Sequence, residues 1–67
     1  MNIKDVGSLI KKRRLILKID QRQLSELSGA SLHTISNIES GKGNPTIEIL
    51  SRILDLLGME LKIDIKG

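Results

Sequence analysis

The sequence predicts a mainly α-helical domain of four helices, followed by one short C-terminal β-strand. Two observations predict the helices: Asp, Ser and Thr residues stand where helix N-caps are expected, and glycines follow the apolar runs that these caps open. A third observation predicts the strand, because apolar residues alternate strictly with charged ones after Gly58. We therefore divide the 67-residue chain into a helical domain, residues 1–58, and a C-terminal strand, residues 59–67.

A first helix is expected from about Asp5 to Leu17, because apolar residues recur there at helical spacing. Their stripe should pack on the following helices, and Ile19 should continue it into the core. The residues of this stripe are Val6, Leu9, Ile10, Ile16 and Leu17.

A second helix is expected from Gln21 to Ser28. Asp20 can accept hydrogen bonds from the free amides of its first turn, and Gln23 follows three residues later, which is the spacing of a capping box. Gly29 can end the helix, because glycine adopts the left-handed backbone conformation without a steric penalty. Ala30 is small enough for a tight turn between two closely packed helices.

Ser31 should cap a third helix, from Leu32 to about Glu39, and Gly41 should end it. Two short helices joined by a tight turn form a helix-turn-helix, and a second helix of this length with a polar outer face can enter a DNA major groove. The predicted inner face of the pair consists of Leu24, Leu27, Ala30, Ile35 and Ile38. The predicted outer face of the third helix consists of Leu32, His33, Ser36 and Asn37.

A fourth helix should begin after Thr46, which can act as its N-cap, and should continue through Leu57. Gly43-Asn44-Pro45 predicts a loop before it, and Gly58 predicts its end. The apolar residues expected to face inward are Ile47, Leu50, Ile53, Leu54 and Leu57.

The last segment has the two-residue period of a half-buried strand. A single strand leaves its backbone groups unpaired, so we expect it to pair with the same segment of a second copy, as an antiparallel ribbon that makes a homodimer. The alternative is an irregular tail. The residues expected to form the dimer contact are Met59, Leu61, Ile63 and Ile65, which alternate with Glu60, Lys62, Asp64 and Lys66.

The helix-turn-helix stretch resembles the Xre/Cro/cI family of lambda-repressor-like DNA-binding domains. The resemblance covers about residues 6–58, and its most specific part is Gly29-x-Ser31-x-x-Thr34-Ile35-Ser36-x-Ile38-Glu39-x-Gly41-Lys42, preceded by Asp20-Gln21. It implies a four-helix lambda-repressor-like fold, double-stranded DNA as the partner, and a structural pair of Arg14 with Glu39. Lys18 stands where many relatives have glycine.

The resemblance also assigns residues to two kinds of DNA contact. The residues implied to read bases are Gln21, Leu32, His33, Ser36 and Asn37, and those implied to hold phosphates are Arg14, Gln21, Thr34 and Lys42. Asn37 has the donor and acceptor that adenine requires, and Leu32 could contact a thymine methyl group. Each also has a structural alternative, since an exposed leucine or a lone histidine is ordinary and Ser36 could bond to its own helix backbone.

Positive charge is concentrated in the first two thirds of the chain. The net charge is +3, but residues 1–42 carry eight Lys or Arg against four Asp or Glu, a net +4, whereas residues 43–67 carry −1. The run Lys11-Lys12-Arg13-Arg14 taken alone indicates a solvated helix face. Beside a helix-turn-helix we interpret it as part of a field that attracts phosphates.

These observations predict a sequence-specific DNA-binding transcriptional repressor that acts as a homodimer on a pseudo-palindromic operator. Helices followed by such a strand resemble the HipB-type antitoxins, so two interpretations stay open: a free-standing repressor, and an autorepressing antitoxin that also binds a HipA-like kinase toxin. The alternative from another class is a protein-interaction module without sequence-specific DNA binding.

Composition argues against several other classes. The absence of cysteine excludes disulfides and a cysteine-ligated zinc site. No apolar run approaches the ~20 residues that span a bilayer, and no signal-peptide pattern is present, so we expect a soluble cytoplasmic protein with no membrane partner. We expect no enzyme, cofactor or metal site, because the sequence holds no clustered carboxylate pair, no histidine with a nucleophile and no phosphate-binding glycine loop.

Overall fold

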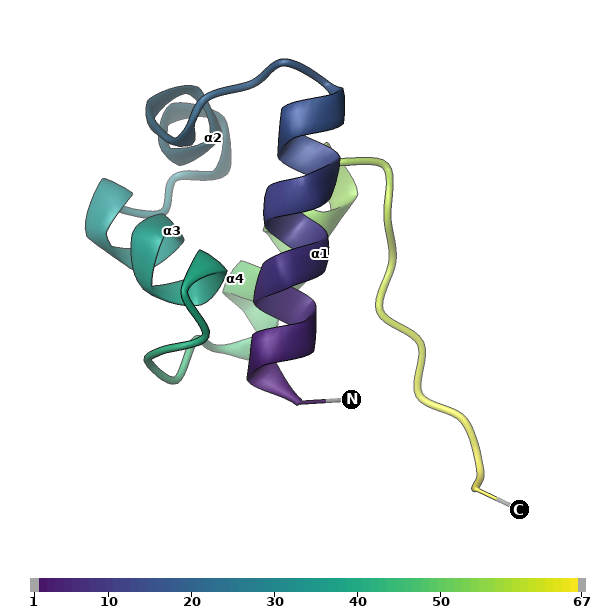
Figure 1. Ribbon diagram of the computed structural model, residues 1–67. Helices are drawn as coiled ribbons and strands as arrows, with labels where there is room; N and C mark the ends of the chain where they lie inside the picture. Colours follow the sequence, from purple (N-terminus) through teal and green to yellow (C-terminus); the bar gives the residue numbers. More distant parts are fainter. Residues whose placement is uncertain (1, 67) are drawn as a thin grey trace.

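Each of the four helices in the computed structural model begins at a side-chain cap. The model describes residues 2–66, and its helices are α1 (Ile3–Ile16), α2 (Gln21–Ser28), α3 (Leu32–Glu39) and α4 (Ile47–Leu56) (Figure 1). The bounds of α2 and α3 are those predicted. The helix α1 begins two residues earlier than predicted, because the Asn2 side chain accepts a hydrogen bond from the Asp5 amide and forms a capping box. The other caps are Asp20, Ser31 and Thr46, as predicted.

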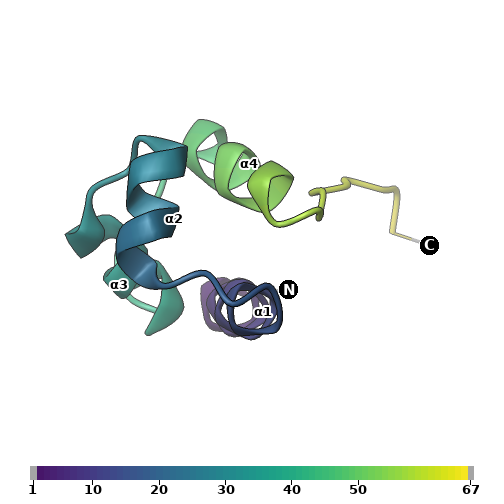
Figure 2. The ribbon, with the colours of Figure 1, turned by 90° about the horizontal axis from the view of Figure 1, so that it is seen from above.

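The core lies where the four helices meet, and it confirms most of the predicted inner faces. Its buried apolar residues are Ile10, Leu24, Ala30, Ile35, Ile38, Ile53, Leu54 and Leu57. Val6, Ile19 and Leu50 are partly buried against them, as are Ile49 and Met59. In Figure 2 α1 is seen end-on, with α3 and α4 on different sides of it. The core therefore joins the helix-turn-helix pair to both the first and the last helix.

A glycine in α1 lets that helix approach the end of α3. Gly7 is buried, and a Cβ atom at this position would collide with the backbone carbonyl oxygen of Ile38. Nothing in the sequence marks Gly7, because it lies inside a helix and far from any predicted turn. Its lack of a side chain sets the spacing between α1 and α3.

Five residues predicted to face inward are exposed, so the prediction was wrong for them. In α2 the buried positions are Leu24 and Ser28, one turn apart, which leaves Leu27 60% exposed. In α4 the buried stripe begins at Ile49 and bypasses Ile47, which is 63% exposed. The other three lie in α1 or directly after it: Leu9, Ile16 and Leu17. The apolar arc of α1 is wider than the part of its surface that the other helices cover.

The turn after α1 contains a left-handed residue. Lys18 has a φ of 58°, a conformation that costs a residue with a side chain more than it costs glycine. The amide of Lys18 donates to the carbonyl of Leu15, and the amide of Ile19 donates to the carbonyl of Arg14. The resemblance had pointed to this position as one where relatives carry glycine, and the backbone here explains that preference.

The C-terminal segment is not a strand over residues 59–66, the part of it that the structure describes. It leaves α4 at Gly58 and extends on the side of the molecule away from α2 and α3 in both views (Figure 1, Figure 2). Within the described residues its backbone pairs with no other segment, and a strand requires such pairing. Met59 packs partly against the core, whereas Ile63 and Ile65 are 91 and 94% exposed. The predicted ribbon therefore stays a prediction that needs a second chain.

No helix in the part of the chain that the structure describes is long and apolar enough to cross a membrane.

Candidate nucleic-acid interface

The turn between α2 and α3 is held by hydrogen bonds from both sides. Gly29 ends α2 with a φ of 77°, as predicted. The Ser25 hydroxyl donates to the Ala30 carbonyl over 2.6 Å, and the Ala30 amide donates to the Ser28 hydroxyl over 3.1 Å. From α4, the guanidinium of Arg52 donates to the Ser28 carbonyl over 3.1 Å. These contacts fix the angle at which α3 leaves the turn.

A buried ion pair connects α1 with the end of α3. Arg14 donates from Nε to Glu39 Oε2 over 2.7 Å and from Nη2 to Glu39 Oε1 over 2.9 Å, and the two side chains are 8 and 3% exposed. The hydrogen bonds that Arg14 donates to Glu39 raise the pKa of Arg14 above its ordinary value, so the guanidinium stays charged. Arg14 also donates to the Ile19 carbonyl over 2.9 Å. The pair that the resemblance implied is confirmed.

This geometry corrects one assignment. Arg14 was expected to hold a phosphate, but its side chain is buried and its donors are directed at Glu39 and at the Ile19 carbonyl. A residue in this position orients α3 from within the domain. We therefore leave Arg14 out of the phosphate-contact set.

The first residue of α2 is attached to the same network. The side-chain amide of Gln21 donates to Glu39 Oε1 over 3.1 Å, so one carboxylate connects α1, α2 and α3. Gln21 is half-buried, and the oxygen of its side-chain amide takes no part in this hydrogen bond. The network thus places Gln21 at the N-terminus of α2, beside α3, where it was expected to contact DNA.

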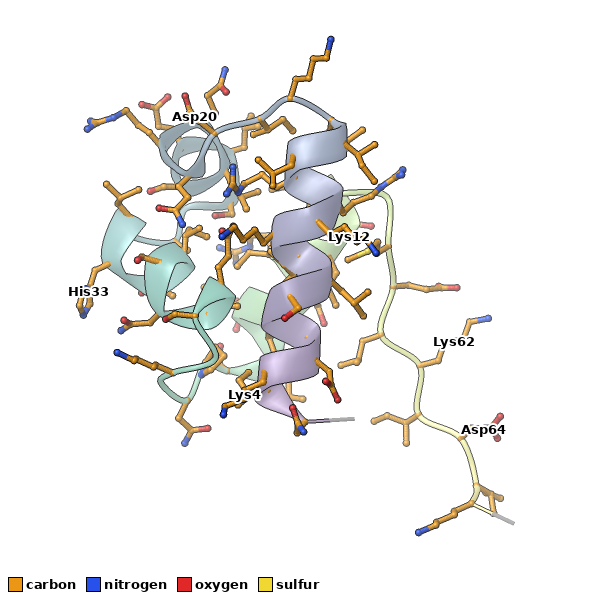
Figure 3. All side chains as sticks on the ribbon, in the orientation of Figure 1. Lys4, Lys12, Asp20, His33, Lys62 and Asp64 are labelled. Atoms are coloured by element: carbon orange, nitrogen blue, oxygen red, sulfur yellow. The ribbon has the colours of Figure 1, made fainter. Side chains whose placement is uncertain are left out.

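The outer arc of α3 carries the other expected base-reading residues. Leu32, His33 and Ser36 are exposed, and Asn37 is half-buried. Figure 3 shows His33 pointing away from the rest of the domain. The Asn37 Nδ2 and His33 Nε2 atoms lie 3.2 Å apart, which joins two of these side chains across one helical turn. The opposite face of α3 is buried through Ile35 and Ile38.

Two residues that were expected to contact phosphates line a hollow between α3 and the loop that follows it. The hollow has a volume of about 140 Å³, and both Thr34 and Lys42 line it. The Thr34 hydroxyl lies 2.9 Å from that of Ser31, and the Lys42 amide donates to the Asn37 carbonyl over 2.8 Å. Asn44 lines the same hollow. It was not among the predicted site residues, because a loop asparagine carries no specific signal.

The basic run of α1 does not form one continuous face. Arg13 donates to the carbonyl of Leu57 over 2.8 Å and so caps the end of α4, while Arg14 pairs with Glu39. Lys12 lies on the side of α1 nearer the C-terminal segment, as Figure 3 shows. Lys4 packs against the Gly41 turn, next to the hollow that contains Lys42. Two of the four residues of this run are therefore structural, and Lys4, which the sequence marked only through its charge, is a basic residue near the end of α3.

Comparison with known proteins places the chain in a family. A helix-turn-helix family model matches residues 10–63, and the chain belongs to this family, the Xre/Cro/cI-like group of DNA-binding transcription regulators. It is 33% identical over 60 residues to the ImmF control region 10 kDa protein of Bacillus phage phi105, a match that covers 90% of this chain and 67% of that protein.

Two further relatives are longer than this chain. An HTH-type transcriptional regulator of Haemophilus influenzae is 45% identical over 47 residues, which are 70% of this chain and 48% of that protein. One of Mycobacterium tuberculosis is 34% identical over 57 residues, which are 85% of this chain and 41% of that protein. The chain therefore spans less than half the length of these two regulators.

Proposed function

We propose that this protein is a sequence-specific transcriptional repressor that binds a pseudo-palindromic operator as a homodimer. The observation that carries the proposal is the fixed presentation of α3. Its inner face is buried, its C-terminal end is held by the pair of Arg14 with Glu39, and its entry turn is held by Arg52 and two serines. A helix held in this way can keep side chains in register with base edges.

In this proposal α3 lies in the major groove and its outer arc reads bases. Asn37 can pair with adenine through its donor and acceptor, and Leu32 can contact a thymine methyl group. His33 and Ser36 extend the same arc. Gln21 reads from the N-terminus of α2, where its backbone amide can also meet a phosphate.

The phosphate contacts in this proposal flank the reading helix. Thr34 and Lys42 line one hollow beside α3, and Gln21 lies at the neighbouring helix start. Contacts of this kind set the position of the protein on DNA without reading sequence. Two copies related by a two-fold axis would place their reading helices one helical turn apart, ~34 Å, and so match an inverted repeat.

Repression would follow from occupancy of an operator that polymerase needs, in the cytoplasm where the DNA lies. A narrower version is an antitoxin that represses its own operon and binds a HipA-like kinase toxin. The C-terminal segment is the feature that favours this version, because helices followed by a segment with this strand pattern resemble the HipB-type antitoxins.

Salt-dependent binding to duplex DNA tests the proposal against a protein-interaction module without DNA binding. We expect the logarithm of the binding constant to fall linearly with the logarithm of salt concentration, with a slope of about −0.9 for each phosphate neutralised. The measurement is a fluorescence anisotropy titration of labelled duplex at several salt concentrations. Affinity that is absent at low salt would contradict the proposal.

A further inference from the structure

The segment after α4 has the side-chain pattern of a strand and no backbone partner among residues 2–66. Within the described residues, the backbone of residues 60–66 makes no hydrogen bond to other backbone, and the Ile65 amide donates only to the side chain of Asp64. Glu60 and Lys62 lie on one face, with Lys62 Nζ 3.4 Å from Glu60 Oε1. The segment is extended in Figure 1, and Figure 3 shows Lys62 and Asp64 pointing to the same side of it.

An apolar groove lies beside the start of this segment. Its volume is about 380 Å³, and its lining is mainly apolar: Val6 and Leu9 of α1, Leu54 of α4, and Met59 and Leu61 of the segment itself. Leu9 and Leu61 are exposed in the single chain. Exposed apolar side chains that adjoin an unpaired strand are typical of a surface that a second chain covers.

We propose that residues 60–66 pair with the same residues of a second copy in an antiparallel register centred on Ile63, and that the partner's Ile65 fills this groove. The inference rests on the homodimer of the proposed function and specifies its contact. The occupant is thus a second copy of this chain.

The charge pattern selects the register. A register that keeps all apolar residues on one face must be centred on a single residue, so that this residue faces its own copy. A centre at Ile63 places Glu60 opposite the partner's Lys66, and Lys62 opposite the partner's Asp64. Every charge then meets an opposite one, which stabilises an antiparallel pair.

Other centres fit less well. A centre at Lys62 or Asp64 places that residue opposite its own copy, and like charges directly opposite each other are destabilising. Centres at Leu61 or Ile65 keep opposite charges paired but overlap over fewer residues of the segment. Ile63 is therefore the centre that combines full overlap with complementary charge.

The same register brings an apolar side chain to the groove. A centre at Ile63 places Leu61 opposite the partner's Ile65, and Leu61 already forms one wall of the groove with Val6 and Leu9. The partner's Ile65 would therefore enter on the same face. The chain's own Ile65 cannot fold back into the groove easily, because residues 59–66 contain no glycine or proline for a reversal.

Single-cysteine variants measure the register directly, because the chain has no cysteine of its own. Directly opposite residues of an antiparallel pair have Cα atoms ~4.5 or ~5.5 Å apart, within the range of a disulfide, whereas diagonal neighbours lie ~7–8 Å apart. We expect Ile63→Cys to form a disulfide-linked dimer under mild oxidation, and the matched controls Lys62→Cys and Asp64→Cys to form far less. A mixture of Leu61→Cys and Ile65→Cys chains should give the mixed dimer.

Failure of the Ile63→Cys crosslink, or preferential crosslinking at any other single position, would overturn the proposed register. Folding is not at risk, because Ile63 is almost fully exposed in the single chain. Salt-dependent DNA binding is measured on the same samples without oxidation. A crosslink at position 63 without DNA affinity would contradict the proposed function alone, and DNA binding with a crosslink elsewhere would contradict this inference alone.

A charge exchange tests the pairing without a covalent bond. Lys62→Glu should raise the dimer dissociation constant about tenfold, because it replaces two attractive contacts by two repulsive ones. Adding Asp64→Lys restores opposite charges across the ribbon and leaves the net charge of the chain unchanged from the original. The double variant should therefore recover the original dissociation constant in sedimentation equilibrium. A double variant as weak as the single one would overturn the charge argument.

The groove is tested by two substitutions on one helix. Leu9→Asp places a charge in the groove lining and should weaken the dimer about tenfold or more. Leu15→Asp is the control, because Leu15 is an exposed leucine of α1 that does not line the groove. Equal dimer dissociation constants for the two variants would overturn the groove assignment.

Discussion

At the scale of single residues, the position of α3 depends on one carboxylate. Glu39 accepts from Arg14 and from Gln21, and so connects the first three helices at a buried point. Desolvating such a pair is costly, but removing one partner is costlier still, because the other charge stays buried without compensation. The pair therefore specifies the position of α3 rather than adding stability by itself.

Replacing this carboxylate should destabilise the fold strongly. We expect Glu39→Gln to lower the free energy of unfolding by about 3 kcal/mol, since Arg14 would then remain charged and buried without a counter-ion. Urea unfolding followed by circular dichroism measures the change, and Glu26→Gln, at an exposed position of α2, is the control. An unchanged midpoint for Glu39→Gln would show that the pair has no structural role.

Base-reading and phosphate contacts should respond differently to substitution. Asn37→Ala should cost roughly 1–3 kcal/mol on a cognate operator and little on random duplex, because it removes a base contact. Lys42→Ala should weaken both to a similar degree and flatten the salt slope by about one phosphate. Titration of both variants against both DNAs separates the two roles. Equal losses on both DNAs for Asn37→Ala would contradict its reading role.

The contacts that the sequence predicted correctly at this scale are those of a side chain with one partner nearby in the chain. The caps at Asp20, Ser31 and Thr46 follow from spacing alone, because each bonds three residues away. The contacts of Arg13 and Arg52 were not predicted, because their partners are backbone carbonyls at the ends of other helices, 44 and 24 residues away. The basic run suggested a solvent or phosphate role for Arg13 and nothing in the sequence marked Arg52; only the packing of the helices reveals that both act as caps.

At the scale of elements, the helix-turn-helix is supported by the contact between α1 and α3. The two helices approach closely because Gly7 has no side chain at the point where α1 meets the carbonyl of Ile38. The periodicity of α1 predicted its apolar arc but not which part of the arc is covered. Leu9 and Ile16 thus belong to the pattern and remain 45 and 63% exposed.

Gly7→Ala tests this contact. Alanine is the better helix former by about 1 kcal/mol, yet we expect a net destabilisation of about 1–3 kcal/mol, because the added methyl group forces α1 away from α3. Ser8→Ala, at the next and exposed position, should be neutral or slightly stabilising. Thermal unfolding of the two variants gives the comparison, and a Gly7→Ala protein more stable than the original would contradict the close approach.

At the scale of the whole molecule, α3 and the C-terminal segment lie on different sides of α1 (Figure 1), so a second copy could pair with the segment while α3 stays accessible. The change of period after Gly58 predicted a C-terminal strand, and within the described residues the segment is extended but unpaired. A single chain cannot complete such a strand, because the hydrogen bonds of a strand require a neighbour.

The dimer should depend on the apolar face of that segment. We expect Ile63→Asp to abolish the dimer, because it places two carboxylates against each other in the centre of an apolar contact. Sedimentation velocity reports the mass directly. Because Ile63 is exposed in the single chain, the helical content should be unchanged; a dimer of unchanged mass would place the interface elsewhere.

Selection from a random double-stranded DNA library at near-physiological salt, followed by sequencing of the retained duplexes, tests the central claim most directly. We predict enrichment of an inverted repeat whose half-sites lie one helical turn apart, because two copies of α3 related by a two-fold axis would read successive major-groove faces. Retained DNA without any enriched sequence, or no retained DNA, would contradict the claim that this protein is a dimeric reader of DNA sequence.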